Sequence, residues 1–409
     1  MDKFVIIGNG VAAAGCIEGI RSTGNKAKIT VISAEKHGVY CRPLISYYLE
    51  DKTDAERMKY RDDGFYEDNN CDVIFAKAVK IDKENSSVIL DNGETVPYSK
   101  LCVAAGSSPF IPSFDGIETV EKKFSFMTLD DASALKKELS SDKDVLIIGA
   151  GLIGLKCAEG IYGKVRSITV CDLADRILSS ILDEDCAKIM QSHLESRGIK
   201  IMTGDSAIRF EGKKAVMKSG KTVEFDILVI AVGVRPNTSL IKDIGGNVNR
   251  GIAVGSNCET SVENIYAAGD CTECTDISDG KSKVIAIMPN AYIQGFTAGV
   301  NMAGGSAEFD NAVPMNSIGF FGMHAMTAGS YGGSMYEEKS EGRIKRLFTE
   351  NDRLTGFMLI GYTERAGIYT SLIREKTPLS SLDFDALRNV ADFTSFPAES
   401  RRHSFGGEV

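Results

Sequence analysis

Residues 4–13 read F-V-I-I-G-N-G-V-A-A, a short apolar run followed by two closely spaced glycines. The apolar run predicts a buried strand, and the pattern Gly8-x-Gly10-x-x-Ala13 follows it directly. A helical stretch, a second apolar run at 29–32 and Glu35 come next. In this order Gly8 makes a tight turn, Gly10 lets the backbone approach a diphosphate, and Ala13 allows close helix–strand packing. The stretch therefore predicts a dinucleotide site at a helix N-terminus, with the acid on a ribose; the alternative is a purely structural glycine turn.

Composition limits the class of protein. A length of 409 residues predicts two or three domains, and 43% hydrophobic with 25% charged residues is typical of a globular chain. The net charge of −9 argues against a nucleic-acid partner. No apolar run approaches the roughly 18 residues that span a membrane, and the first residues lead straight into a strand. We therefore expect no membrane segment, no signal peptide and a cytoplasmic location.

A second unit of the same kind begins at residue 145. The run V-L-I-I leads into Gly149-Ala150-Gly151-Leu152-Ile153-Gly154, then into a helix and a strand over 167–171. Asp172 ends that strand. This fingerprint has glycine at all three positions.

The repeat extends beyond the two glycine turns. Residues 89–106 read ILDNGETVPYSKLCVAAG, and residues 216–233 read VMKSGKTVEFDILVIAVG, with Gly, Thr, Val, Leu, Ala and Gly in register. Each fingerprint is thus followed by its own hairpin and its own apolar strand ending in glycine. The sequence predicts two nucleotides bound close together.

Several further elements follow from local patterns. Residues 264–268 predict a strand that closes on Gly269-Asp270, and Met288-Pro289 opens a helix over 288–303. Residues 51–70 are strongly charged and predict a surface helix, and 72–82 predict one strand. Three short strands at 316–321, 344–350 and 355–362 predict a small sheet, followed by a helix over 365–376.

With these motifs in hand, the chain resembles the FAD-dependent pyridine nucleotide–disulfide oxidoreductases over nearly its whole length. The stretches 41–49, 289–291 and 365–369 are most similar to NADH:rubredoxin oxidoreductases and to the flavin modules of NAD(P)H nitrite reductases. The resemblance implies an α/β fold with two doubly wound dinucleotide-binding domains and a small α+β C-terminal domain. The expected boundaries are 1–112 and 240–312 for the FAD domain, 113–239 for the NAD(P)H domain and 313–409 for the last domain.

The resemblance also implies site residues. Asp270 matches the acid that binds a ribityl hydroxyl of FAD, and Arg42 matches a basic residue that reaches the flavin nucleotide. Glu35 is expected at the adenosine ribose, although it lies one or two residues later than usual. The full set expected at FAD is Gly8, Gly10, Val11, Ala12, Ala13, Glu35, Arg42, Pro43, Val79, Ala105, Gly106, Ser107, Gly269, Asp270, Met288 and Pro289. The set expected at NAD(P)H is Gly149, Gly151, Leu152, Ile153, Gly154, Asp172 and Gly233.

Lys156 is the candidate catalytic residue. Many members of the resembled family carry a glutamate at this position, close to flavin and nicotinamide. A lysine there is expected to stabilise negative charge on the reduced flavin, and the alternative is an exposed helix lysine.

The cysteines and histidines leave alternatives but no metal site. Related thiol enzymes carry a redox cysteine near the position of Cys41. Because Cys41 lacks a partner cysteine at CxxxxC spacing, we expect it to have a structural role. Cys271 and Cys274 are CxxC-spaced without a thioredoxin-like context. His324 is expected to be packed rather than to act as a base. The four histidines show no ligand spacing, and we expect no metal.

The predicted function is an NADH-preferring, FAD-dependent oxidoreductase that passes electrons to a small redox protein such as rubredoxin. Asp172 favours NADH, since an acid there accepts the ribose 2′-hydroxyl and repels a 2′-phosphate, while Arg176 weakens this argument. Two alternatives remain: a thiol-based disulfide, peroxide or oxygen reductase that uses Cys41, and an NADH-sensing interaction protein similar to apoptosis-inducing factor. A monomer or a homodimer is expected.

Overall fold

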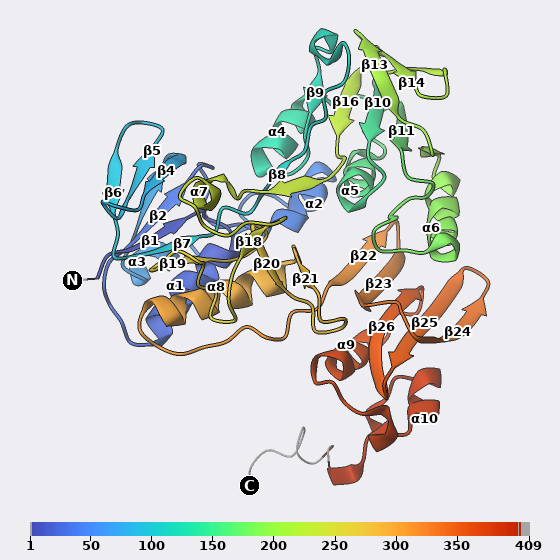
Figure 1. Cartoon of the computed structure of the whole chain (residues 1–409). Helices are drawn as coiled ribbons and strands as arrows, with labels where there is room; N and C mark the ends of the chain where they lie inside the picture. The colour runs from blue at the N-terminus through green and yellow to red at the C-terminus, as the bar shows by residue number, and fades with distance from the viewer. Residues whose placement is uncertain (1, 400, 402–409) are drawn as a thin grey trace. The chain divides into compact units, whose positions relative to one another are not determined.

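The first apolar run forms β1 (Phe4–Ile7), the central strand of a five-stranded parallel sheet. The strand order is β19-β7-β1-β2-β3 (Figure 1). The other strands are β2 (Ile29–Ser33), β3 (Cys71–Phe75), β7 (Lys100–Val103) and β19 (Ile265–Ala267). All four residues of β1 are buried, as a central parallel strand requires. The structure is a computed structural model and describes residues 2–399 and 401.

Two helices far apart in the sequence pack side by side on this sheet. They are α1 (Val11–Ser22), which follows the first glycine turn, and α8 (Met288–Met302) (Figure 1). A Cβ atom on Gly15 would collide with the carbonyl of Tyr292, and one on Gly295 would collide with the carbonyl of Ala12. The two helices run in the same direction, so both N-termini lie at the same edge of the sheet.

The second fingerprint builds an equivalent parallel sheet, ordered β12-β11-β10-β16-β9. Its strands are β9 (Lys123–Phe124), β10 (Asp144–Ile148), β11 (Ser167–Asp172), β12 (Lys200–Thr203) and β16 (Ile227–Ile230). Helix α5 (Leu152–Ile161) follows its glycine turn, and α4 (Leu129–Glu138) begins with a capping box formed by Thr128 and Asp131. The predicted repeat is confirmed, because each parallel sheet is accompanied by a three-stranded antiparallel sheet. These are β4 (Ala78–Asp82), β5 (Ser87–Leu90) and β6 (Thr95–Pro97), and β13 (Ala207–Glu211), β14 (Lys214–Met217) and β15 (Thr222–Glu224).

Short elements connect the larger ones. The antiparallel pair of β8 (Ser107–Pro109) and β17 (Val234–Pro236) continues the chain beyond the glycine that follows each of β7 and β16. The remaining short elements are α2 (Ile45–Leu49), α3 (Phe65–Asp68), α7 (Ser239–Lys242), β18 (Ile252–Ala253), β20 (Thr272–Thr275), β21 (Ser282–Lys283), and the 3-10 turns Arg42–Leu44 and Ile117–Thr119.

Contacts divide the chain into two compact units. Unit 1 comprises Met1–Ile177, Gly198–Cys274 and Ser282–Asp310, and so holds both parallel sheets. Unit 2 comprises Leu178–Arg197, Thr275–Lys281 and Asn311–Val409. It is built on an antiparallel sheet ordered β22-β23-β26-β25-β24. Its elements are β22 (Met315–Phe320), β23 (Met323–Gly329), β24 (Ser334–Ser340), β25 (Arg343–Glu350), β26 (Arg353–Ile360), α6 (Glu184–Ser196), α9 (Ala366–Arg374), α10 (Phe384–Asn389) and the 3-10 turns Leu379–Ser381 and Phe393–Ser395.

An ion-pair cluster joins α6 to the sheet of unit 2. The guanidinium of Arg346 on β25 pairs with Asp183, Asp185 and Glu337, and its side chain is 9% exposed. Asp183 is also the N-cap of α6, where it accepts from the Cys186 N–H. The expected three-domain division stays a prediction.

The α/β fold class is confirmed, and three local expectations are corrected. Residues 51–70 do not form one helix, since only Phe65–Asp68 is helical; a polar run without an apolar stripe has no face to bury. Residues 72–82 form two strands, which separate at Ala76 and Lys77, where Lys77 bonds to Asp91 instead of continuing the ladder. The C-terminal sheet has five strands rather than three. The two strands that were not predicted are β24, a polar edge strand, and β23, which is rich in small residues, and neither has a strong hydrophobic pattern. Across residues 2–399 and 401, no helix is long and apolar enough to cross a membrane.

Candidate functional site

The two glycine turns have the same backbone geometry. Gly8 has φ +108° and Gly149 has φ +112°. A Cβ on Gly8 would collide with the carbonyl of Ala104, and one on Gly149 with the carbonyl of Ala231. A side chain is therefore excluded at both turns by conformation and by space.

Each turn leads into a helix whose N-terminus lacks a side-chain cap. Gly10 is the N-cap of α1 and Gly151 the N-cap of α5, and neither helix receives a side-chain cap bond. A Cβ on either glycine would meet nothing within 4 Å, so open space lies before both helix ends. Backbone N–H groups and the helix dipole at such an end suit a diphosphate. Gly154 packs so tightly that its Cβ would collide with the Gly149 carbonyl, as close helix–strand contact requires.

The residues expected at FAD come together at one edge of the first sheet. They follow the carboxyl ends of four neighbouring strands, where open α/β sheets bind their ligands. Gly8, Gly10, Val11, Ala12 and Ala13 follow β1; Glu35, Arg42 and Pro43 follow β2; Ala105, Gly106 and Ser107 follow β7; Gly269 and Asp270 follow β19; and Met288 and Pro289 open α8. Val79 lies apart on β4 and is 48% exposed.

Direct contacts hold the ends of these strands. A Cβ on Gly269 would lie 3.0 Å from the Cβ of Ala12, so the chain after β19 passes close to α1. The Ser107 hydroxyl donates to the Asp270 carbonyl at 3.1 Å. Burial raises the pKa of the Asp270 carboxyl, and the charge of Arg42 partly offsets this effect. Asp270 thus lies in a desolvated position with one cation nearby.

Glu35, Tyr40 and Arg42 form a network that the sequence did not predict. The Glu35 carboxylate accepts from Arg42 Nη2 at 2.8 Å and from the Tyr40 hydroxyl at 2.7 Å. The second arm of Arg42 donates to the Met127 carbonyl at 3.0 Å, and the Leu129 N–H donates to the Tyr40 oxygen at 3.1 Å. Tyr40 directly precedes the stretch 41–49 that carries the family resemblance, whereas nothing in the sequence pointed to Met127.

Cys41 lies beside the start of α8. Its thiol is 3.9 Å from the sulfur of Met288. Burial raises the pKa of the Cys41 thiol, and the Leu44 N–H opposes this only in part. Cys41 is therefore a protonated thiol near neutral pH, which is the opposite of an activated nucleophile.

The residues expected at NAD(P)H gather at the equivalent edge of the second sheet. The turn from Gly149 to Gly154 leads from β10 into α5, with Leu152 as the first helical residue. Ile153 and Gly233 line a small apolar hollow together with Met127. Asp172 ends β11, and its two carboxylate oxygens accept from the N–H groups of Ala150 at 2.7 Å and Ala174 at 2.8 Å. Asp172 thus fixes the glycine turn and holds its carboxylate at the turn's edge.

Lys156 lies on α5 and pairs with Glu159 one turn further on. Its ammonium also lies 5.0 Å from the centre of the Tyr47 ring. The side chain is 20% exposed, so Lys156 is not an exposed helix lysine. Its predicted role toward the flavin stays a prediction, and Glu159 would offset its charge.

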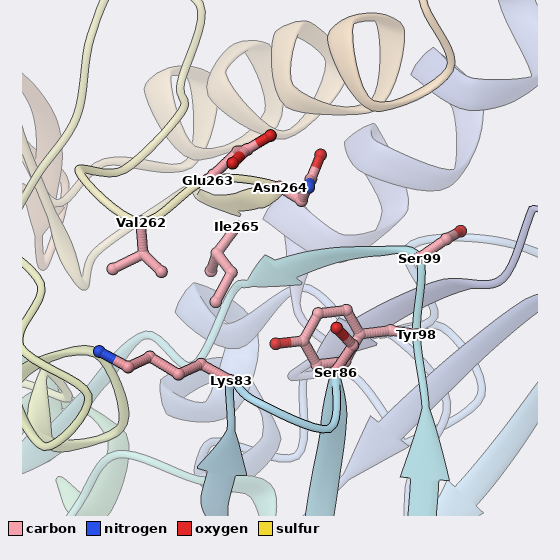
Figure 2. Close-up of a pocket in the computed structure, with 8 residues that line it drawn as sticks. All are labelled: Lys83, Ser86, Tyr98, Ser99, Val262, Glu263, Asn264 and Ile265. Carbon is pink, nitrogen blue, oxygen red and sulfur yellow. The ribbon is translucent and has the colours of Figure 1, made fainter.

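A cavity of about 250 Å³ lies at the opposite edge of the first sheet. Figure 2 shows Tyr98 and Ile265, which are among its lining residues. The cavity lies at the amino ends of β7 and β19, whereas the first glycine turn lies at the carboxyl ends of the strands of this sheet. The ammonium of Lys83 at its rim donates to the Ile244 carbonyl at 2.9 Å. The cavity therefore belongs to neither glycine turn.

Three further expectations concern cysteines, histidine and metals. Cys271 and Cys274 are not joined by a disulfide; burial raises the pKa of the Cys271 thiol to about 12. His324 is exposed, so the expected packed position is wrong: it sits on β23 opposite Gly319, which leaves room for the ring on the sheet surface. Among residues 2–399 and 401, no group of three or more His, Cys, Asp or Glu side chains gathers as in a metal site.

The model of one protein family matches residues 2–295, and its description is pyridine nucleotide-disulphide oxidoreductase. The chain belongs to this family. Among relatives, the NADH-dependent phenylglyoxylate dehydrogenase subunit epsilon of Aromatoleum evansii is 32% identical over 394 residues, which cover 93% of each chain. The nitrite reductase [NAD(P)H] of Bacillus subtilis is 30% identical over 92% of this chain, but the match spans only 48% of that longer protein. The solved NADH:rubredoxin oxidoreductase of Clostridium acetobutylicum is 25% identical with a TM-score of 0.74, covering 96% of this chain and 98% of that one.

Membership of the pyridine nucleotide–disulphide oxidoreductases makes this chain an oxidoreductase. The family implies a flavin and a pyridine nucleotide, and the two open helix N-termini fit two dinucleotides. The predicted recognition of the family is thus confirmed. The roles of the individual site residues stay predictions.

Proposed function

We propose that this chain oxidises NADH with bound FAD and passes the electrons to a small redox protein. The observation that carries the proposal is the pair of equivalent glycine turns, each followed by an uncapped helix N-terminus at the carboxyl edge of its own parallel sheet. In such an enzyme the flavin accepts a hydride from the nicotinamide and hands on electrons. The chain's own task is to bind and orient two nucleotides.

The first sheet supplies the proposed FAD site and the second the proposed NADH site. The α1 N-terminus would hold the FAD diphosphate, and Asp270, which is partly buried, would bind a ribityl hydroxyl. The α5 N-terminus would hold the NADH diphosphate. Met127 would lie between the two proposed sites, since its carbonyl accepts from Arg42 and the residue lines the hollow together with Ile153.

The names of the relatives support a protein acceptor. One similar solved structure is a rubredoxin oxidoreductase, and the similar Aromatoleum evansii chain is a dehydrogenase subunit. Both therefore work with another protein component. We propose a rubredoxin-like protein as the electron acceptor. The chain is proposed to act as a monomer or a homodimer.

Anaerobic reduction tests this function. The 409-residue chain with bound FAD is reduced with one equivalent of NADH, and its reoxidation is then followed separately with rubredoxin, oxygen and a disulfide. We expect fast reoxidation by rubredoxin alone. Fast reoxidation by the disulfide would favour the thiol-based reductase, whereas slow turnover with every acceptor would favour the NADH-sensing protein.

We expect NADH to be preferred over NADPH by about tenfold or more in kcat/KM, which corresponds to about 1.4 kcal/mol. Asp172 holds its carboxylate at the edge of the second glycine turn. Arg176, the cation that weakened the prediction, pairs with Asp175 at 2.8 Å. A 2′-phosphate would thus meet the Asp172 carboxylate, and the nearest cation in sequence already has an acidic partner. Steady-state kinetics with both cofactors measure the ratio, and equal values would contradict the assignment.

We expect Cys41→Ser to keep NADH-driven reduction of ferricyanide within about threefold of the unchanged protein, a difference of less than about 0.7 kcal/mol. The Cys41 thiol is held protonated by burial and contacts Met288 rather than a second thiol. The control is Cys71→Ser, because Cys71 lies on β3, and burial also raises the pKa of its thiol. A hundredfold loss for Cys41→Ser alone, with flavin still bound, would instead support a thiol mechanism.

A further inference from the structure

The strand register shows which residue of the first unit corresponds to Asp172. Ile32 is the last partner of β1 before Gly8, and Cys171 is the last partner of β10 before Gly149. The N–H of Gly8 donates to the Ile32 carbonyl at 2.8 Å, and the N–H of Gly149 donates to the Cys171 carbonyl at the same distance. The next residue is Asp172 in the second unit and a serine, Ser33, in the first. Glu35 therefore lies two residues beyond Ser33, which occupies the position at which an acid is expected to bind a ribose.

Ser33 cannot take over that role, because it is turned inward. It is 1% exposed, and its hydroxyl donates to the Glu35 carbonyl at 2.6 Å. This bond fixes the backbone that carries Glu35. The usual position of the acid is thus occupied by Ser33, which makes a structural hydrogen bond, and the acid Glu35 follows two residues later.

The Glu35 carboxylate is already bonded by protein groups on both oxygens. Arg42 donates to one and Tyr40 to the other, and the Glu35 side chain is 28% exposed. Burial raises the pKa of the Tyr40 hydroxyl, so it remains a donor at any physiological pH. A charged acceptor between a guanidinium and a hydroxyl makes strong, directional hydrogen bonds.

Arg42 is held in one orientation by these contacts. Its Nη2 donates to Glu35, its Nη1 donates to the Met127 carbonyl, and its guanidinium lies 5.5 Å from the centre of the Tyr40 ring. Two of its five N–H groups have hydrogen-bond acceptors among the described residues, so three remain for a ligand. The charge of Arg42 also acts on Asp270, at the carboxyl edge of the first sheet. A fixed guanidinium with free donors at this edge suits a diphosphate.

We propose that Glu35 is a positioning residue that orients Arg42 toward the diphosphate of the flavin nucleotide, and that it does not bind the adenosine ribose. This inference rests on the FAD site proposed above. It replaces the ribose contact that the family resemblance implies for Glu35.

A thermodynamic cycle tests the inference. The 409-residue chain is freed of flavin, and dissociation constants are measured by fluorescence for FAD and for an FAD analogue whose adenosine lacks both ribose hydroxyls. The cycle compares the unchanged protein with Glu35→Gln. We expect Glu35→Gln to weaken both ligands by the same factor, about tenfold, because effects of independent groups add.

Two results would overturn the inference. If removing the hydroxyls weakens binding to the unchanged protein but not to Glu35→Gln, then Glu35 binds the ribose. If Glu35→Gln binds both ligands as the unchanged protein does, then Glu35 positions nothing. Absence of FAD binding by the unchanged protein would instead overturn the proposed function itself.

A second comparison separates positioning from general destabilisation. Arg42→Met removes the group on which Glu35 is inferred to act, so we expect Arg42→Met combined with Glu35→Gln to bind FAD as weakly as Arg42→Met alone. Fully additive losses in this pair would contradict an action through Arg42. Tyr40→Phe, which removes the other Glu35 contact, is expected to cost a smaller part of the same FAD affinity.

Discussion

Gly10→Glu is expected to abolish FAD binding while leaving the fold intact. Gly10 has an ordinary extended backbone, φ −97°, and a Cβ there meets nothing within 4 Å. The new carboxylate would therefore fit the protein but occupy the space before the α1 N-terminus and repel a diphosphate. We expect FAD affinity to fall by at least about a hundredfold, or about 2.7 kcal/mol. The purified variant should be colourless, and titration of the flavin-free protein with FAD measures the loss.

The stability of the flavin-free protein provides the internal check. A carboxylate at an uncapped helix N-terminus is favourable by about 0.3–1 kcal/mol. The flavin-free Gly10→Glu variant should thus unfold at the same denaturant concentration as the flavin-free unchanged protein, or slightly higher. A yellow variant with normal FAD affinity would show that the first glycine turn is not the diphosphate site.

Gly151→Glu is expected to have the opposite effect to Gly10→Glu: it should keep FAD binding and weaken NADH binding. Gly151 has the same extended backbone as Gly10, φ −81°, and the same open space around its Cβ. The variant should be yellow, with FAD bound as tightly as in the unchanged protein, but its affinity for NADH should fall by at least about a hundredfold, or about 2.7 kcal/mol. Stopped-flow reduction by NADH, compared with reduction by dithionite, measures this.

Each of the two variants serves as the control for the other. Dithionite does not need the second glycine turn, so it should reduce the flavin of Gly151→Glu at the normal rate. Loss of FAD from Gly151→Glu would reverse the assignment of the two sheets to FAD and NADH. Normal reduction of this variant by NADH would remove the assignment of the second sheet to NADH. The two substitutions are matched in residue type, in helix position and in added charge.

The nucleotide-binding framework was predictable because its determinants are local. A glycine turn after an apolar run needs only about ten neighbouring residues to be recognised, and the repeat supplied an independent copy. Gly8 and Gly149 have similar φ angles, and a Cβ on either would collide with the carbonyl of the residue that follows the neighbouring strand. The strand closing on Asp270 and the helix opened by Pro289 also form as predicted.

The parts that sequence reasoning missed depend on contacts between distant segments. Met127 accepts from Arg42 across 85 positions of sequence, and its backbone carbonyl carries no side-chain signal. Helix α6 groups with the C-terminal sheet because Arg346 pairs with Asp183 and Asp185, about 160 positions away. Glu35 illustrates a third limit, because its distance from the strand was visible in the sequence but its hydrogen-bond partners were not.

The packing of α8 against α1 has a consequence for synthesis on the ribosome. The first nucleotide site takes its strands and helices from residue 4 through residue 302, whereas the strands and glycine turn of the second lie between residues 123 and 230. The glycine faces of α1 can be covered only after α8 has left the exit tunnel, so the second site is assembled first although it is encoded later. If the first sheet holds the flavin as proposed, its loading is a late event, and a chain truncated before residue 288 would have the proposed pyridine-nucleotide site but an incomplete flavin site.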